Sequence, residues 1–211
     1  MKEKVRMKSI LLLPVLLLLG GCFGSQKRGV EVSYHDLGVT AYQPAENRSG
    51  STIEGVRKVE VRSASWLASA DMQYRFTYSD ATRRRSYADS RWVATPAEML
   101  EFAMTRALVG NSASATYGCR LQIELDEFIQ VFDAPQISYV VVETRLSLFG
   151  PRADRALAQR KLHLTRAANS ADAVGGVVAL SAAAGELVTE SSKWLELLKR
   201  ETPGIVAQCN S

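Results

Sequence analysis

Apolar and polar residues alternate with a period of two along several stretches of this chain. Such alternation predicts β-strands with one buried and one solvent-facing side. The alternating stretches cover residues 56–61, 121–126, 140–148 and 157–165. Two further β-rich stretches, residues 74–78 and 83–87, flank a four-residue polar turn and predict a β-hairpin. A brief extended piece is expected at residues 34–37.

Two other stretches repeat with the period of a helix. Residues 96–108 follow Thr95, and Glu98 stands three positions after that threonine. This arrangement predicts a capping box, with Pro96 in the first turn, where a missing N–H costs nothing. Gly110 is expected to end the helix.

The second helical stretch is long and covers residues 172–199, with Ser170 as its expected cap. Gly175, Gly176 and Gly185 lie inside it. Each glycine disfavours a helix by about 1 kcal/mol relative to alanine, so we expect close packing against the sheet at these positions.

The order of elements is strand, hairpin, helix, three strands and helix. Strand runs interrupted by helices are typical of an α+β fold. We therefore expect a two-layer sandwich. It would have an antiparallel-rich sheet of about four strands, two helices packed on one face, and the β-hairpin in addition.

The N-terminus carries four basic residues before an apolar run at residues 10–19. This arrangement is typical of a secretory signal peptide, and the run is about half the roughly 20 residues that a membrane span needs. It ends in Leu19-Gly20-Gly21-Cys22, which resembles the lipobox of bacterial lipoproteins. An ordinary signal peptide with a chance cysteine is the alternative.

The lipobox resemblance implies that Cys22 is acylated and becomes the first residue of the mature chain. Two or three acyl chains would anchor the protein stably in a membrane. We expect a signal peptide at residues 1–21, a lipidated tether at 22–33 and one domain at 34–211.

The 211 residues carry a formal net charge of +4. Removing residues 1–21 takes away four basic residues and Glu3, which leaves a balance of +1. The basic character therefore belongs mostly to the signal, and it gives no reason to expect a nucleic-acid partner. The hydrophobic content of 46% is enough for a packed core.

Besides Cys22, the chain has Cys119 and Cys209. Export would place them in an oxidising compartment, where two cysteines tend to pair. We expect a disulfide bond, with two separate thiols as the alternative.

The residues that carry chemistry in enzymes are scattered. The two histidines, His35 and His163, stand apart, and no cluster has the spacing of a metal site. The acidic residues near Glu124 are expected to lie on a solvated strand face. We therefore expect no catalytic residues, no metal and no cofactor, and hence no enzyme.

The hairpin region is rich in arginine and aromatic residues. The run Arg83-Arg84-Arg85 is expected to lie on a solvated strand, with contact to lipid headgroups or an acidic partner as the alternative. The aromatic residues fit a core and an interface equally well. If they form an interface, the partner-binding residues are Arg75, Tyr87, Arg91 and Trp92.

Four motifs follow the lipobox in order. They are Tyr34-His35-Asp36-Leu37, Tyr74-Arg75-Phe76, residues 86–92 ending in Arg91-Trp92, and a Pro96-started helix ending in Arg106-Ala107-Leu108. Together they resemble the ABC-type transport auxiliary lipoprotein family. The resemblance covers residues 34–199, and it departs from the family at His35, where a second aromatic residue is common.

The resemblance implies a non-catalytic docking subunit of an ABC-type system that contains a mammalian-cell-entry domain protein. Such systems move lipids between the inner and outer membranes. Phe23 follows the anchor cysteine where inner-membrane retention would favour Asp, which implies the periplasmic face of the outer membrane. The alternative is a stand-alone envelope lipoprotein that binds a lipid or another hydrophobic ligand. Homo-oligomerisation is left open.

Overall fold

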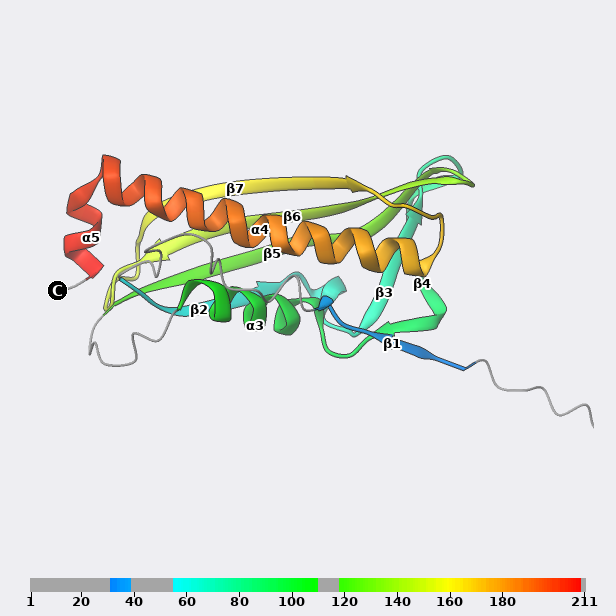
Figure 1. Ribbon diagram of the computed structural model, residues 1–211, viewed down its shortest axis with the longest axis horizontal. Helices are drawn as coiled ribbons and strands as arrows, with labels where there is room; N and C mark the ends of the chain where they lie inside the picture. Colours follow the sequence, from blue (N-terminus) through cyan, green and yellow to red (C-terminus); the bar gives the residue numbers. More distant parts are fainter. Residues whose placement is uncertain (1–30, 39–54, 110–117, 210–211) are drawn as a thin grey trace, which may run out of the picture. The chain divides into compact units, whose positions relative to one another are not determined.

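The computed structural model describes residues 31–38, 55–109 and 118–209 (Figure 1). The described residues from Val32 onward form one compact unit. The predicted signal peptide, Cys22 and Gly110 lie outside the described residues.

The described chain forms a seven-stranded sheet. In the order β1-β4-β3-β5-β6-β7 each strand pairs with the next, while β2 pairs with another part of β5. The strands are β1 (Ser33–His35), β2 (Val56–Ser63), β3 (Asp71–Phe76), β4 (Asp80–Trp92), β5 (Cys119–Ala134), β6 (Ile137–Phe149) and β7 (Ala156–Ala167).

Strand β5 is the centre of the sheet. Its 16 residues pair antiparallel with β6 along one edge. On the other edge, β2 pairs in parallel with the first half of β5, as in the register of Val61 with Ile123. Strand β3 pairs in parallel with its last part, as in the register of Phe76 with Phe132.

The α+β class is therefore confirmed, but the expectation of about four strands with a separate hairpin was wrong. Alternation predicted β5 only over residues 121–126, although the strand continues to Ala134. That extra length gives the hairpin, β3 and β4, an edge to join. The hairpin turn is also shorter than expected, because Phe76 pairs with Asp80.

The helices lie on one side of the sheet. Helix α3 (Pro96–Leu108) packs on β2, and α4 (Ala173–Glu201) packs on β5, β6 and β7 and contacts α3 (Figure 1). Apolar side chains of both helices and of the inward sheet face form one buried cluster. A single 3-10 turn, η1 (Ser65–Leu67), follows β2, and a short helix, α5 (Pro203–Cys209), follows α4.

Helix α3 begins as predicted. The Thr95 side chain accepts a hydrogen bond from the Glu98 N–H, and Glu98 accepts one from the Thr95 N–H at 2.9 Å. The backbone of β2 also gains a partner from α3, since the Val61 N–H donates to a Glu101 carboxylate oxygen at 2.8 Å.

The expected cap of α4 was wrong. Asp172, not Ser170, is the N-cap, and its carboxylate accepts a hydrogen bond from the Gly175 N–H at 2.8 Å. Ser170 instead donates its hydroxyl hydrogen to Asp172 at 2.7 Å. Helix α4 is long and apolar enough to meet the length and hydropathy criteria for a membrane span, but half of its most apolar segment is buried inside the domain.

The expected disulfide bond between Cys119 and Cys209 is present. It joins the first residue of β5 to the last residue of α5, and both cysteines are buried. The C-terminal helix is thus linked covalently to the central strand.

Candidate interaction surface

The sheet face opposite the helices, which we call the open face, carries mainly charged and polar residues. They come from positions that alternate with the core residues of β2, β5, β6 and β7. Salt bridges pair these charges, between strands as in Glu124–Arg145 at 2.9 Å and along β2 as in Lys58–Glu60 at 2.6 Å. Exposed pairs of this kind contribute little to stability, so their main effect is to make the face hydrophilic.

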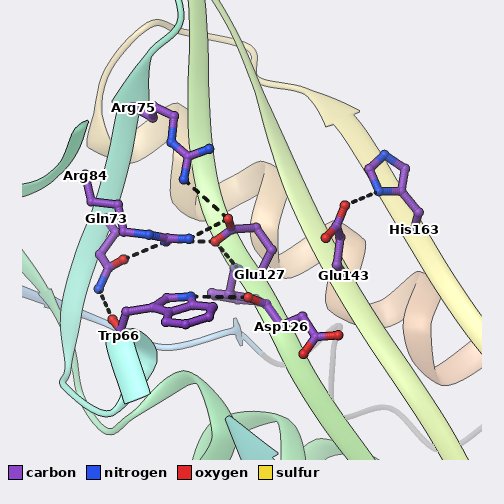
Figure 2. A network of polar contacts seen from close by, with 9 residues as sticks. Trp66, Gln73, Arg75, Arg84, Asp126, Glu127, Glu143 and His163 are labelled. Carbon is purple, nitrogen blue, oxygen red and sulfur yellow. Dashed lines mark hydrogen bonds and ion pairs between the residues drawn. The ribbon is translucent and has the colours of Figure 1, made fainter. Parts of the chain in front are cut away.

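A β-bulge interrupts the open face in the middle of β5. Leu125 pairs with Thr144 and Glu127 pairs with Glu143, so Asp126 is the additional residue. A bulge bends its strand and redirects nearby side chains. Here Leu125 and Phe128 remain in the core, while Glu127 extends onto the open face toward β3 and β4 (Figure 2).

Two arginines of the hairpin bind the Glu127 carboxylate (Figure 2). Arg84 of β4 makes a two-point contact, with Nη1 to Oε1 at 2.8 Å and Nη2 to Oε2 at 2.6 Å. Arg75 of β3 places its Nη2 3.6 Å from Oε2. The Glu127 side chain is only 14% exposed, and a paired, partly buried contact of this geometry is stronger than an exposed pair.

Trp66 of η1 lies against this cluster. The Arg84 guanidinium is 5.5 Å from the centre of its ring, within the range of a cation–π contact. Its indole N–H donates to the Asp126 carbonyl at 3.3 Å, and Gln73 donates to the Trp66 carbonyl at 2.6 Å. Trp66 is nevertheless 52% exposed, so a positioned aromatic ring remains open to solvent.

We call Trp66, Arg75, Arg84 and Glu127 the Trp66 cluster. It combines two cations and one anion with an exposed indole ring. Arginine and tryptophan are the residues most enriched at the energetic centres of interfaces. The cluster can therefore present a flat aromatic surface and excess positive charge to a protein partner.

The arginine run of the hairpin divides between the two faces. Arg84 joins the open face, whereas the Arg85 guanidinium lies 5.1 Å from the Phe76 ring centre. Phe76 belongs to an aromatic group that also contains Tyr74, Tyr87 and Phe132.

The residues predicted to bind a partner do not form one surface. Arg75 belongs to the Trp66 cluster. Tyr87 lies on the other face, where its hydroxyl donates to Gln130 at 2.8 Å. Burial raises the pKa of the Tyr87 hydroxyl well above its usual range, so this group stays protonated at neutral pH.

Arg91 and Trp92 are both held by the domain itself. Arg91 pairs with Asp71 at 3.1 Å and also donates to the carbonyls of Tyr87 and Ser90. Trp92 is 1% exposed and packs against Phe128 in the core. In this structure Trp92 is therefore a core residue that no partner can reach without a rearrangement.

His163 lies on the surface of β7, as predicted. Its Nδ1 is 2.8 Å from a Glu143 carboxylate oxygen (Figure 2), and both side chains are well exposed. With Asp126 they line a shallow depression of about 290 Å³. Within residues 31–38, 55–109 and 118–209, no group of three metal-binding side chains comes together.

Sequence reasoning missed Trp66, Arg84 and Glu127 as a unit. Trp66 was one of the aromatic residues of the hairpin region that fitted a core and an interface equally well, and Glu127 was one of the acidic residues near Glu124 expected on a solvated face. The sequence did contain a signal for the bulge. Asp126 and Glu127 are two consecutive acidic residues, and they interrupt the alternation of β5 as one extra residue in the strand would.

Comparisons with known proteins bear on the fold. No protein-family model and no curated protein sequence matches this chain. A solved structure from Xanthomonas campestris, described as belonging to the family DUF330, is 19% identical with a TM-score of 0.60, over 70% of this chain and 89% of that one.

A second solved structure, of an uncharacterized protein, is 13% identical with a TM-score of 0.60, over 78% of this chain and 99% of that one. At these identities the two structures establish a shared fold and no function. A candidate lipoprotein from Caulobacter crescentus has a TM-score of 0.36 at 11% identity, over 65% of this chain and 90% of that one. This similarity is too low to support a shared fold or function.

Proposed function

We propose that this chain is an acylated envelope lipoprotein that acts as a non-catalytic docking subunit of an ABC-type transport system containing a mammalian-cell-entry domain protein. The observation that carries the lipoprotein part of the proposal is Leu19-Gly20-Gly21-Cys22 after a short apolar run, and the docking role rests on the resemblance of the four later motifs. An acyl anchor holds a protein to a membrane surface without spanning it. Phe23 favours the periplasmic face of the outer membrane.

The Trp66 cluster supports the docking role. Its arginines are fixed by Glu127, its indole N–H by the Asp126 carbonyl, and the backbone of Trp66 by a hydrogen bond from Gln73, so a partner would meet a preorganised surface. Preorganisation lowers the entropic cost of association. We place the docking surface on the open face around Trp66, and not at Tyr87 and Trp92.

The alternative function, a lipoprotein that binds a lipid between helices and sheet, gains less support. Described core residues occupy that space, with Ile123 at 0%, Leu180 at 3% and Leu187 at 0% exposure. Native mass spectrometry of the protein purified from membranes would detect a bound lipid and would favour this alternative.

The anchor and the docking surface are tested with the full chain in its native envelope. We expect intact mass spectrometry to find an acyl adduct on Cys22. The Cys22→Ser variant should be absent from the membrane fraction. A chain that remains in the membrane after this substitution contradicts the anchor.

For docking, we expect Trp66→Ala to reduce co-purification of the mammalian-cell-entry protein about ten-fold or more, as for an interface centre. Phe102→Ala is the matched control, because Phe102 is 54% exposed on α3 and lies 5.6 Å from the Arg106 guanidinium. Equal thermal stability of both variants shows that the fold is retained. Equal recovery of the partner with both variants would contradict the assignment of the docking surface.

A further inference from the structure

A groove of about 600 Å³ runs between β1 and the N-terminal half of α4. Its apolar lining comes mainly from Tyr34, Leu37, Val93, Val177 and Val178. Leu37 is fully buried, and the other side of the groove is open to solvent.

Exposed apolar side chains concentrate around this groove. Ten large apolar residues are exposed in the described part of the chain. Half of them lie in or directly beside β1, the end of β4 or the first part of α4, namely Val32, Tyr34, Val93, Val174 and Val178. We call these five residues the groove patch. Val174 and Val178 are one helical turn apart on the outer side of α4, at 61% and 52% exposure.

The groove patch is fixed in position by the fold. Strand β1 pairs in parallel with the end of β4, and the Val93 N–H donates to the His35 carbonyl at 2.9 Å. The Ser181 hydroxyl of α4 donates to the Leu37 carbonyl. The chain therefore enters the domain beside α4 in a defined way.

The tether places this surface near the membrane. This step rests on the proposed acylation of Cys22. Ser33, where β1 begins, is only eleven residues after Cys22. At no more than about 3.6 Å per residue, the entry point lies within about 40 Å of the anchor.

We propose that the groove patch rests on the phospholipid bilayer to which Cys22 is anchored. Tyrosine side chains favour the boundary between headgroups and acyl chains, and the valines would lose exposed apolar area there. Charged groups adjoin the patch, since Glu31 precedes Val32 and the Asp172 carboxylate caps α4 two residues before Val174. The Asp36 carboxylate accepts a hydrogen bond from the Gly38 N–H, and Arg166 pairs with Glu186 on the far side of Val178.

This orientation agrees with the docking surface. The outer side of α4 and the open face lie on opposite sides of the sheet (Figure 1). When α4 faces the bilayer, the Trp66 cluster faces away from it and is accessible to a partner.

The test uses the lipidated full chain in phosphatidylcholine–phosphatidylglycerol vesicles, with an environment-sensitive fluorophore on Val178→Cys. We expect blue-shifted emission and loss of most of the emission when the vesicles contain nitroxide-labelled lipid. Lys161→Cys is the control, because Lys161 is exposed beside His163 on the open face, and its probe should behave as in water. Adding Tyr34→Asp should reduce the quenching at Val178→Cys while the protein still floats with the vesicles.

Flotation separates the two proposals. A chain that does not float overturns the anchor and the bilayer contact together. A chain that floats while its Val178→Cys probe stays in water overturns the bilayer contact alone. A blue shift without quenching by labelled lipid assigns the groove patch to a second copy of the chain and also overturns the bilayer contact.

Discussion

Gly175 and Gly176 mark the place where α4 comes closest to its neighbours. A Cβ atom on Gly175 would lie 2.1 Å from the Ser170 carbonyl oxygen, and one on Gly176 would lie 2.1 Å from the Gln130 Oε1. Gln130 is 1% exposed and is held by Ser138 and Tyr87. The helix-disfavouring glycines are therefore required by close packing at these two positions.

Gly185 differs, because a Cβ there would meet no atom within 4 Å. We expect Gly185→Ala to raise the free energy of unfolding by about 0.5–1 kcal/mol through helix propensity alone. Gly176→Ala should lower it by about 1–3 kcal/mol, because the added methyl group overpacks a tight contact. Urea unfolding of both variants measures the difference, and an equal effect of the two substitutions would contradict this explanation.

At the scale of the element, the start of α4 depends on one carboxylate. Hydrogen bonds from the Gly175 N–H and then from the Ser170 hydroxyl lower the pKa of Asp172 below its usual range. A carboxylate whose pKa is lower in the folded than in the unfolded state stabilises the fold above its unfolded pKa. That contribution is lost as the pH falls through the folded pKa.

We expect Asp172→Ala to lower the free energy of unfolding by about 1 kcal/mol at pH 7, the usual cost of losing an N-cap. Asp172→Asn should retain most of the stability, because asparagine caps helices about as well as aspartate does. Only the wild type should lose stability at this site below about pH 4. Unfolding curves at pH 7 and pH 3 test the difference, and an identical acid sensitivity of wild type and Asp172→Asn would count against it.

At the scale of the whole molecule, the Cys119–Cys209 disulfide joins residues 90 positions apart in the sequence. It fastens α5 to the start of β5, while α3 covers β2 on the neighbouring edge. The bond therefore holds the end of the C-terminal helix at the beginning of the central strand.

Cys209→Ser should lower the free energy of unfolding by about 2–5 kcal/mol, because a crosslink over a long loop restricts the unfolded chain. Reduced wild type should show the same loss, and the reductant should not affect the variant. Guanidinium unfolding with and without reductant measures both effects. A reduced wild type as stable as the oxidised protein would contradict a stabilising role.

Much of the fold follows from local patterns. The alternation of β2, β6 and β7 and the capping box at Thr95 and Glu98 were recognisable, because a period of two residues or a spacing of three is contained within one element. The pairing of the cysteines was expected from export, and the structure contains the bond.

The interaction surface could not be predicted in the same way, since it depends on which strands meet and in which register. The bulge at Asp126 turns Glu127 toward Arg84 of another strand, and the pairing of β4 with β1 leaves Trp92 in the core. A pattern along one strand shows that successive side chains lie on opposite faces of the sheet. The face that it occupies, and the residue it meets there, come from contacts between segments far apart in the sequence.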